Sequence, residues 1–482
     1  MDNRVDIKSG EAVYQQIATH FKRLIVTGEL PPGSHLPQQR QLARELGVNR
    51  STVSAAYDEL LATGLIRSRQ GHGTWVSEDA WGMSVAPAPD WVTYLAQGTY
   101  RPTQPLMHRL WEANRQSHNI NFARGEMSSE LWPTSQIHSL LRQLPAQMPL
   151  GYGDPRGEHS LRVAVSHHLK HHYGLDVPPH RILITAGSQQ GLTLLAQGLL
   201  RPGDAIGLER PSYAYSLPIL TSAGLRPFPI SVDADGLQPE EIPILVRRHK
   251  IRMIFMTPTY QNPTSTTLPL LRRYRLLQTC IDLGIPLVED DAHGVLTLDG
   301  TPPPPKLVAA LPGADQHVIY IGTLSKTVAP GLRVGWMTGP SSVIERLAGI
   351  REQMDFGLSV VSQSLAEKIL DSDIWHPILT QLLTALSRRR DRMVKALNQY
   401  LSDSLSFAVP RGGYHIWARL AQPMGDVALV EAALKQRVVV VPGSAYGAEP
   451  GYVRLTYASS GENEIDEGVR RLQRALLPKS PH

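Results

Sequence analysis

The sequence predicts an α/β fold with a small, mainly helical unit in front of it. Six short apolar runs rich in β-branched residues recur along most of the chain, and most are followed by turn residues and an amphipathic helical pattern. Repeated βα units of this kind predict a mostly parallel sheet. The first 76 residues show helical spacing and then two short strand patterns, and a stretch rich in Ala, Pro, Gly and Thr follows.

Length and composition narrow the class of protein. At 482 residues the chain is long enough for about three structural units. With 42% hydrophobic and 19% charged residues it can form large packed cores, which excludes a largely disordered protein. The formal net charge of +5 permits an anionic partner without requiring one.

Sequence features of secreted and membrane proteins are missing. Cys280 is the single cysteine, so no internal disulfide can form, and the N-terminus has no basic stretch followed by an apolar region. No run of about 18 apolar residues occurs. We therefore expect a soluble, cytoplasmic protein with no membrane partner.

The N-terminal unit has the pattern of three helices and a hairpin. Apolar residues at positions 14, 17, 21, 24 and 25 predict an amphipathic first helix that ends near residue 28. A second helix is predicted over residues 38–46 and stops at Gly47. A third begins at Asn49, a residue type that favours helix N-caps, and ends at residue 64. This is helix-turn-helix spacing, and residues 65–76 predict two short strands, a wing.

Residues 28–76 resemble the winged helix of the GntR superfamily. The resemblance implies binding to an operator in double-stranded DNA, with the start of the third helix in the major groove and other residues on phosphates or in the minor groove. The residues assigned to DNA are Arg40, Arg50, Ser51, Thr52, Arg69 and His72. The chain departs from the family at Gln38, where a serine cap is usual. The alternative is a protein-interaction module, since nine basic and seven acidic residues give residues 1–76 a net charge of only +2.

These patterns divide the chain. We expect a DNA-binding domain over residues 1–76, a linker over residues 77–118 and a large domain over residues 119–482. The linker carries Trp81, Trp91 and Tyr94, which a free linker has little reason to keep, so we expect them to dock onto the following domain. From about residue 366 to 482, a long helix at 377–401, a strand at 414–420 and an amphipathic run at 427–435 predict a smaller α+β lobe.

In a mostly parallel sheet, ligands bind at the carboxyl ends of the strands. The strands predicted for the large domain are 181–186, 205–209, 251–257, 285–290, 318–322 and 334–338. After the strand at 318–322 come Thr323, Ser325 and Lys326, with Arg333 seven positions beyond the lysine. Such a lysine can form a Schiff base with an aldehyde, and an arginine can bind a phosphate through two hydrogen bonds. A lysine in a loop is most often only solvated, so the assignment depends on other segments.

Four other segments supply the groups that a pyridoxal phosphate (PLP) aldehyde needs. Ser188 begins a helix directly after a strand, where free backbone N–H groups can bind a phosphate. Tyr213 can stack on a flat ring. Asn262 can donate a hydrogen bond to a phenolate oxygen, and Asp290, at a strand end, can pair with a protonated pyridine nitrogen. Each can be a turn or a cap when taken alone, but together and in this order they predict a PLP site.

The order of these segments resembles fold-type I aminotransferases, and with the winged helix in front the chain resembles MocR/GabR-type regulators of the GntR superfamily. The resemblance implies a homodimer with pyridoxal 5'-phosphate as cofactor. It implies Lys326 as the Schiff-base lysine, Asp290 on the pyridine nitrogen and Asn262 on the ring oxygen. The further residues that it places at the cofactor are Ser188, Gln189, Tyr213, Ser325 and Arg333, and it places Arg454 on a substrate or effector carboxylate. Tyr152, in a matching turn at 151–157, would belong to the partner subunit's site.

Two positions depart from the family pattern. Where a tyrosine usually follows the aspartate, this chain has Ala292 and His293, so Asn262 and an imidazole are expected to hold the ring oxygen. Ser265 replaces the glycine usual in the NPTG turn, which asks more of the local backbone.

A cluster of histidines lies on one predicted helix. It forms two i, i+4 pairs, a spacing that can hold zinc, and consists of His167, His168, His171 and His172. No cysteine or third ligand type accompanies them. We interpret them as a solvated helical face and assign no metal.

The sequence therefore favours a PLP-dependent transcriptional regulator that senses an amine, an amino acid or PLP through its aminotransferase-like domain. Ligand binding would favour one arrangement of domains over another. One alternative is a catalytically active aminotransferase with an appended DNA-binding domain, because the retained residues suffice in principle for a half-reaction. Another is a repressor that has lost PLP.

Overall fold

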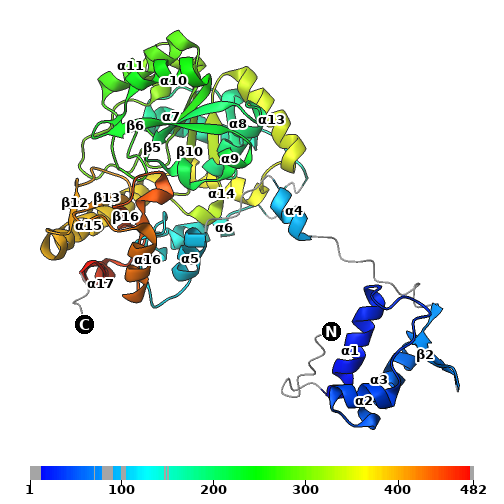
Figure 1. Cartoon of the computed structure of the whole chain (residues 1–482). Helices are drawn as coiled ribbons and strands as arrows, with labels where there is room; N and C mark the ends of the chain where they lie inside the picture. Colours follow the sequence, from blue (N-terminus) through cyan, green and yellow to red (C-terminus); the bar gives the residue numbers. More distant parts are fainter. Residues whose placement is uncertain are drawn as a thin grey trace. The chain divides into compact units, whose positions relative to one another are not determined.

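The computed structural model of the chain describes residues 12–69, 71–78, 91–98, 105–145, 148 and 151–477. The chain forms two units, residues 1–98 and residues 99–482 (Figure 1). Among the described residues, no helix is both long enough and apolar enough to cross a membrane.

The first unit is a helical core with a two-stranded wing. Its elements are α1 (Val13–Val26), α2 (Gln39–Leu46), α3 (Arg50–Ala62), β1 (Ile66–Arg69), β2 (Gly73–Val76) and α4 (Trp91–Gln97). Gly47 ends α2 in the left-handed region at φ 65°, and the Asn49 side chain caps α3 by accepting the Ser51 N–H at 3.3 Å. Gln38, at the start of α2, makes no side-chain cap. The predicted helices and wing are confirmed.

The aromatic residues expected to dock lie on or before α4. Trp91 and Tyr94 are exposed on this helix and contact each other, with ring centroids 5.9 Å apart. Trp81 lies outside the described residues. Docking of these side chains onto the large domain stays a prediction.

The second unit contains a large domain and a small lobe. The chain enters it through α5 (Pro105–Asn114), β3 (Ile120–Asn121) and α6 (Thr134–Arg142). The large domain continues with α7 (His159–Tyr173), β4 (Ile182–Thr185), α8 (Ser188–Gly198), β5 (Ala205–Arg210), α9 (Ile219–Ser222), β6 (Arg226–Asp233), β7 (Gly236–Leu237), α10 (Ile242–His249), β8 (Ile251–Met256), α11 (Leu270–Leu283), β9 (Leu287–Asp290), α12 (Leu307–Ala310), β10 (Val318–Thr323), β11 (Gly335–Thr338), α13 (Ser341–Asp355) and α14 (Val360–Asp371). The small lobe follows with α15 (Trp375–Leu401), β12 (Leu405–Phe407), β13 (His415–Leu420), α16 (Asp426–Lys435), β14 (Val438–Val439), β15 (Val441–Pro442), β16 (Tyr452–Thr456) and α17 (Ile465–Leu476).

The large sheet has the order β4-β11-β10-β9-β8-β5-β6-β7. The strand pairs from β10 through β9, β8 and β5 to β6 are parallel, while β11 is antiparallel to both of its neighbours and β7 is antiparallel to β6. A mostly parallel sheet is therefore confirmed.

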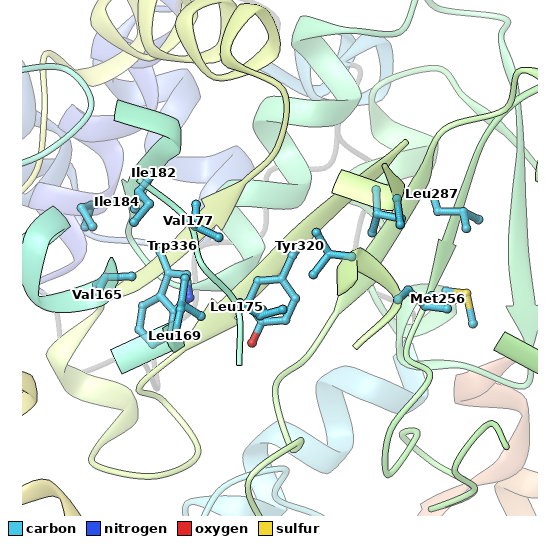
Figure 2. Packing of buried hydrophobic residues seen from close by; sticks show 14 of the residues in the cluster. Val165, Leu169, Leu175, Val177, Ile182, Ile184, Met256, Leu287, Tyr320 and Trp336 are labelled. Carbon is cyan, nitrogen blue, oxygen red and sulfur yellow. The ribbon is translucent and has the colours of Figure 1, made fainter. Parts of the chain in front are cut away.

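Helices cover both faces of this sheet. Successive strand residues point to opposite sides, so each strand contributes to the core on either face. On β4, Ile182 and Ile184 join the core that contains the buried residues of α7, α11 and α14, and Leu183 joins the core of α8 and α13. Figure 2 shows the first core, in which Val165 and Leu169 lie near Trp336. These strands are buried on both faces, as their continuous apolar runs predict.

The small lobe is built on an antiparallel sheet, β12-β13-β16-β15, packed against α15, α16 and α17. Its core also takes in Ile120, Phe122 and Met127, and β3 pairs with β14 in parallel. The segment just before the large domain thus belongs to the small lobe. Conversely, α14 and Trp375 at the start of α15 pack into the large-domain core, so the small lobe begins within α15 and not near residue 366.

Two sequence expectations differ from the structure. The linker predicted for residues 77–118 contains α5, which buries Leu110 and Ala113 against the small lobe. His168 is buried, with its ring 4.8 Å from Trp375 and 5.8 Å from Trp336 between centroids, so a fully solvated histidine face was wrong. The other three histidines of that cluster are exposed.

Candidate functional site

The candidate cofactor residues gather at the carboxyl edge of the large sheet. Each comes from a different strand: Ser188 follows β4, Tyr213 follows β5, Asn262 follows β8, Asp290 ends β9 and Lys326 follows β10. Because these strands run in the same direction, their carboxyl ends meet at one edge, as the strand pattern predicts.

Lys326 is held by a backbone carbonyl. Its Nζ donates to the oxygen of Gly125 at 2.6 Å. Burial and the nearby charge of Arg454 lower the pKa of Lys326 to about 8, while Glu126 and Asp290 oppose the shift. A lysine with a lowered pKa is unprotonated more often at neutral pH, which is the form that attacks an aldehyde.

Asp290 has a buried oxygen, Oδ1, with no hydrogen-bond partner among the described residues. Burial, and then the like charge of Asp291, raise the pKa of Asp290 to about 7, and the charge of Lys326 opposes this. A protonated ring nitrogen placed against Oδ1 would supply the missing donor and stabilise the charged carboxylate.

The two neighbours of Asp290 face the other side of the sheet and are paired there. Glu289 lies 3.9 Å from Arg273, and both side chains are fully buried. Asp291 accepts hydrogen bonds from Lys306 Nζ and from the Tyr320 hydroxyl, each at 2.8 Å. Strand alternation therefore leaves Asp290 as the carboxylate directed to the site.

Tyr213 and Asn262 are fixed to each other. The Tyr213 N–H donates to the Asn262 carbonyl at 2.8 Å, and Gln189 Nε2 donates to the Tyr213 hydroxyl at 3.3 Å. The buried Gln261 joins the two loops, because its Nε2 donates to the Pro211 carbonyl at 2.6 Å. These contacts fix the loops that carry the predicted stacking ring and the predicted amide donor.

Arg454 lies buried between the large domain and the small lobe. Its Nη1 donates to Asn262 Oδ1 at 3.2 Å, and its Nη2 donates to the Ala123 carbonyl. The Tyr446 ring lies 4.9 Å from its guanidinium carbon, and its Nε has no partner among the described residues. A buried guanidinium with a free donor is suited to bind a carboxylate.

His293 is buried beside the same cations, and neither ring nitrogen has a hydrogen-bond partner among the described residues. Burial, with the charges of Lys326 and Arg454, lowers the pKa of His293 to about 3, so the imidazole is neutral. The ring of His415 lies 5.5 Å away and that of Tyr414 5.2 Å away, between centroids. A neutral imidazole can donate one hydrogen bond to a ring oxygen, as expected from its position after Asp290.

The predicted phosphate-binding groups surround the start of α8. Gly187 precedes it with φ 82°, and a Cβ there would lie 2.9 Å from an Arg333 nitrogen. Arg333 is exposed and donates to the carbonyls of Ala186 and Pro330. Ser188 begins the helix, where free N–H groups favour an anion. Ser325 lies after β10, its hydroxyl 3.0 Å from that of Thr323.

Ser265 adopts φ 58°, a left-handed conformation that glycine takes without strain. Its hydroxyl donates to the His415 carbonyl at 2.8 Å, which ties this turn to β13. Ser265 therefore adopts the backbone conformation, unfavourable for a residue with a side chain, that the replacement of glycine predicts.

The donors and acceptors of this site fit PLP. A free carboxylate oxygen, a lysine with a lowered pKa and an arginine beside a helix start are available for a ring nitrogen, an aldehyde and a phosphate respectively. Gly125 and Ala123, whose carbonyls accept hydrogen bonds from Lys326 and Arg454, were not predicted from the sequence. No motif signals them, because only their backbone oxygens take part.

The residues predicted to contact DNA lie on the surface of the first unit. Arg40, Arg44 and Arg50 line a shallow hollow between α2 and the start of α3. Ser51 is exposed beside them, Thr52 is half-buried, and Arg69 and His72 are exposed on the wing. Among the described residues, no carboxylate pairs with Arg40, Arg50 or Arg69 at ion-pair distance. Their contacts with DNA stay a prediction.

Comparisons with known proteins agree with both units. Residues 117–472 match the family described as aminotransferase class I and II, and residues 13–76 match bacterial regulatory proteins of the gntR family. The uncharacterized HTH-type transcriptional regulator YdfD of Bacillus subtilis (strain 168) is 34% identical over 462 residues, which cover 95% of each chain. The HTH-type transcriptional regulator NorG of Staphylococcus aureus (strain N315) is 26% identical, over 91% of this chain and 98% of that protein.

A solved structure is similar to the second unit. It is the kynurenine aminotransferase of Pyrococcus horikoshii in complex with PMP, with a TM-score of 0.75 and 27% identity. The similarity covers 80% of this chain and 98% of that one.

Proposed function

Because the chain belongs to the class I and II aminotransferase family and carries a gntR-family unit in front of it, we propose that it is a transcriptional regulator that binds PLP. The related chains YdfD and NorG, which match along nearly their whole length, are named as HTH-type transcriptional regulators. The arrangement of units corresponds to MocR-type regulators, and such a protein acts on DNA in the cytoplasm.

The cofactor assignment rests on one observation: a buried carboxylate oxygen and a lysine with a lowered pKa lie near each other at the sheet edge. Asp290 Oδ1 has no hydrogen-bond partner in the part of the chain that the structure describes, and the nearby Lys326 has a lowered pKa. Bound PLP would supply an electron-withdrawing ring to an amine attached to its aldehyde. Lys326 would bind the aldehyde, Asp290 the ring nitrogen, and Asn262 and His293 the ring oxygen. Tyr213 would stack on the ring, with Ser188, Gln189, Ser325 and Arg333 around the phosphate.

Arg454 favours an effector that carries a carboxylate, such as an amino acid. Its buried Nε has no partner within the described ranges, and its charge acts on the nearby Lys326, so one small molecule can reach both groups. Other ligands compatible with the site are a simple amine, which needs only the Lys326 position, and PLP itself.

The protein would act as a homodimer on paired DNA half-sites. Tyr152 is 89% exposed, and its ring contacts that of Phe356, which is also exposed. This exposed aromatic pair is suited to contact the partner subunit. In the first unit, Arg50, Ser51 and Thr52 at the start of α3 would face the major groove, with Arg40, Arg69 and His72 on the backbone or in the minor groove. A coupling free energy of about 1–3 kcal/mol between ligand and DNA would change operator occupancy several-fold.

A second candidate function is transamination. Lys326, Asp290, Asn262 and Arg454 lie together in the geometry described above, and these groups suffice in principle for a half-reaction. Multiple turnovers with amino acids and a 2-oxo acid, without sequence-specific DNA binding, would favour the enzyme over the regulator.

The experiment that tests the proposed function is a gel shift and footprint on the DNA upstream of the protein's own gene, with and without PLP. Specific protection that changes with PLP is the expected result. For an operator elsewhere, a duplex selected from a random-sequence pool by the purified protein serves as the probe. Failure to select any sequence would contradict the regulator.

A further inference from the structure

We propose that α5 and residues 121–125 transmit the change between the ligand-free and the ligand-bound site to the point where the chain enters the second unit. This inference rests on the proposed function and concerns how the same site regulates DNA binding. The contacts that connect α5 with Lys326 and Arg454 all lie within the second unit.

The first helix of the second unit is α5, so in chain order it follows the N-terminal unit and its connecting segment. It is anchored to the small lobe: Arg109 donates to Glu431 on α16 at 2.8 Å, and a second nitrogen of Arg109 lies 2.7 Å from the other carboxylate oxygen. Leu110 and Ala113 are buried against the lobe.

The apolar cluster under α5 contains residues of the candidate site. Besides Leu110 and Ala113 it includes Ala123 and Tyr446, and Tyr213 packs against it. The Tyr446 ring underlies Arg454, and Ala123 gives Arg454 its carbonyl oxygen. A shift of these site residues would therefore press directly on α5, because a close-packed cluster transmits displacement.

A hydrogen-bonded chain makes a second connection. Asn121 Nδ2 donates to Asn114 Oδ1 at the end of α5, at 2.6 Å. Asn121 Oδ1 accepts the N–H groups of Ala123 at 3.0 Å and Arg124 at 2.9 Å, and the Arg124 guanidinium donates to the Asn114 carbonyl. The last turn of α5 and the residues 121–125 are thus joined through side chains at two points.

At its other end the segment binds both groups that the proposed function gives to ligands. The Ala123 carbonyl accepts from Arg454, and the Gly125 carbonyl accepts from Lys326 Nζ at 2.6 Å. A carboxylate is a stronger acceptor for a guanidinium than a neutral carbonyl. An effector carboxylate would therefore replace the Ala123 oxygen, and attachment of PLP to Lys326 would end its contact with Gly125. Ligands and segment compete for the same donors, which gives the two states different contacts.

The test separates ligand binding from its effect on DNA. The variant carries Asn114→Ala and Arg124→Met, which remove the side-chain link to α5 and leave both carbonyls in place. Arg115→Ala, an exposed residue next to Asn114, is the matched control. PLP affinity is measured by absorbance, and affinity for the selected duplex is measured without PLP and at saturating PLP.

We expect saturating PLP to change the DNA affinity of the wild type and the control about 5- to 150-fold. The double variant should bind PLP but change its DNA affinity by a clearly smaller factor than the wild type, because it loses the hydrogen-bonded link and keeps only the apolar cluster under α5. A double variant that keeps the full change in DNA affinity would overturn the inference. A double variant whose change in DNA affinity returns when the PLP concentration is raised would overturn it too, because only its PLP binding would then be weaker. If the double variant does not fold, Asn114→Ala alone is used with the same criteria. A wild type that binds PLP and DNA without any coupling would contradict the proposed function instead.

Discussion

Replacing Asp290 by asparagine should stabilise the ligand-free protein at neutral pH. Burial and the like charge of Asp291 raise the pKa of Asp290 from its ordinary value of 3.8 to about 7. The folded protein therefore holds this proton more tightly than the unfolded chain does, and the free energy of unfolding falls as the pH rises between these values. A shift of about 3 pKa units corresponds to about 4 kcal/mol. Asparagine keeps the shape without a proton to lose, so the advantage of the variant should grow from near zero at about pH 4 to about 4 kcal/mol above about pH 7.

Urea unfolding of both ligand-free proteins across this pH range measures the difference. Glu289, another buried acid with a raised pKa, is present in both proteins and is not shifted by Asp290, so its contribution cancels. The charge of Asp290 adds to the raised pKa of Glu209, so part of the gain in the variant comes through Glu209. Added PLP should then stabilise the wild type more than Asp290→Asn, because only the wild type offers a carboxylate to the ring nitrogen. If the free energies of unfolding of the two ligand-free proteins change with pH in parallel, Asp290 does not destabilise the fold at neutral pH, and the reasoning is refuted.

Three further outcomes are expected. Lys326→Ala should remove the attachment of PLP that borohydride makes stable, while circular dichroism shows an intact fold. Lys170→Ala, a change at an exposed lysine, should retain this attachment. Attachment of PLP to Lys326→Ala would mean that another lysine reacts. Arg50→Ala should weaken DNA binding by about 1–3 kcal/mol in a gel shift, whereas Arg23→Ala on α1 should not, and equal affinities would place the groove contact elsewhere. Burial lowers the pKa of His168 to about 3 from 6.5, so the wild type should lose up to about 5 kcal/mol of stability as the pH falls between these values. His168→Leu should lessen that loss in unfolding measurements, and an unchanged acid response would contradict the assignment.

The sequence predicted the strands and the edge at which the site residues meet, because apolar runs and the polar residues after them are local signals. Lys326, Asp290 and Asn262 lie where their order along the chain predicts. The strand β6 was missed, since Pro227 and Pro229 argue against a strand. They are tolerated because β7 pairs only with the end of β6, which leaves their outer side without ladder partners.

Features that depend on distant residues could not be read from the pattern. His168 shares the polar spacing of its exposed neighbours, but Trp375, far along the chain, covers it. The contacts of Ala123 and Gly125 use backbone oxygens, which every residue possesses. Sequence patterns report side-chain chemistry and local periodicity, so neither kind of feature leaves a signal.

The three consecutive acids of β9 have a consequence for strand register. If β9 slipped by one residue, Glu289 or Asp291 would still bring a carboxylate to the site, but Asp290 would turn toward the opposite core. Arg273 and Lys306 are buried there at positions that match the side chains of Glu289 and Asp291. In a slipped strand Asp290 would reach only one of these two cations, and Val288 or Ala292 would stand at the other. One buried cation would then lose its carboxylate, at a cost of several kcal/mol. The buried cations therefore act as a check on strand alignment during folding, and chains that misalign β9 are penalised before any ligand is present.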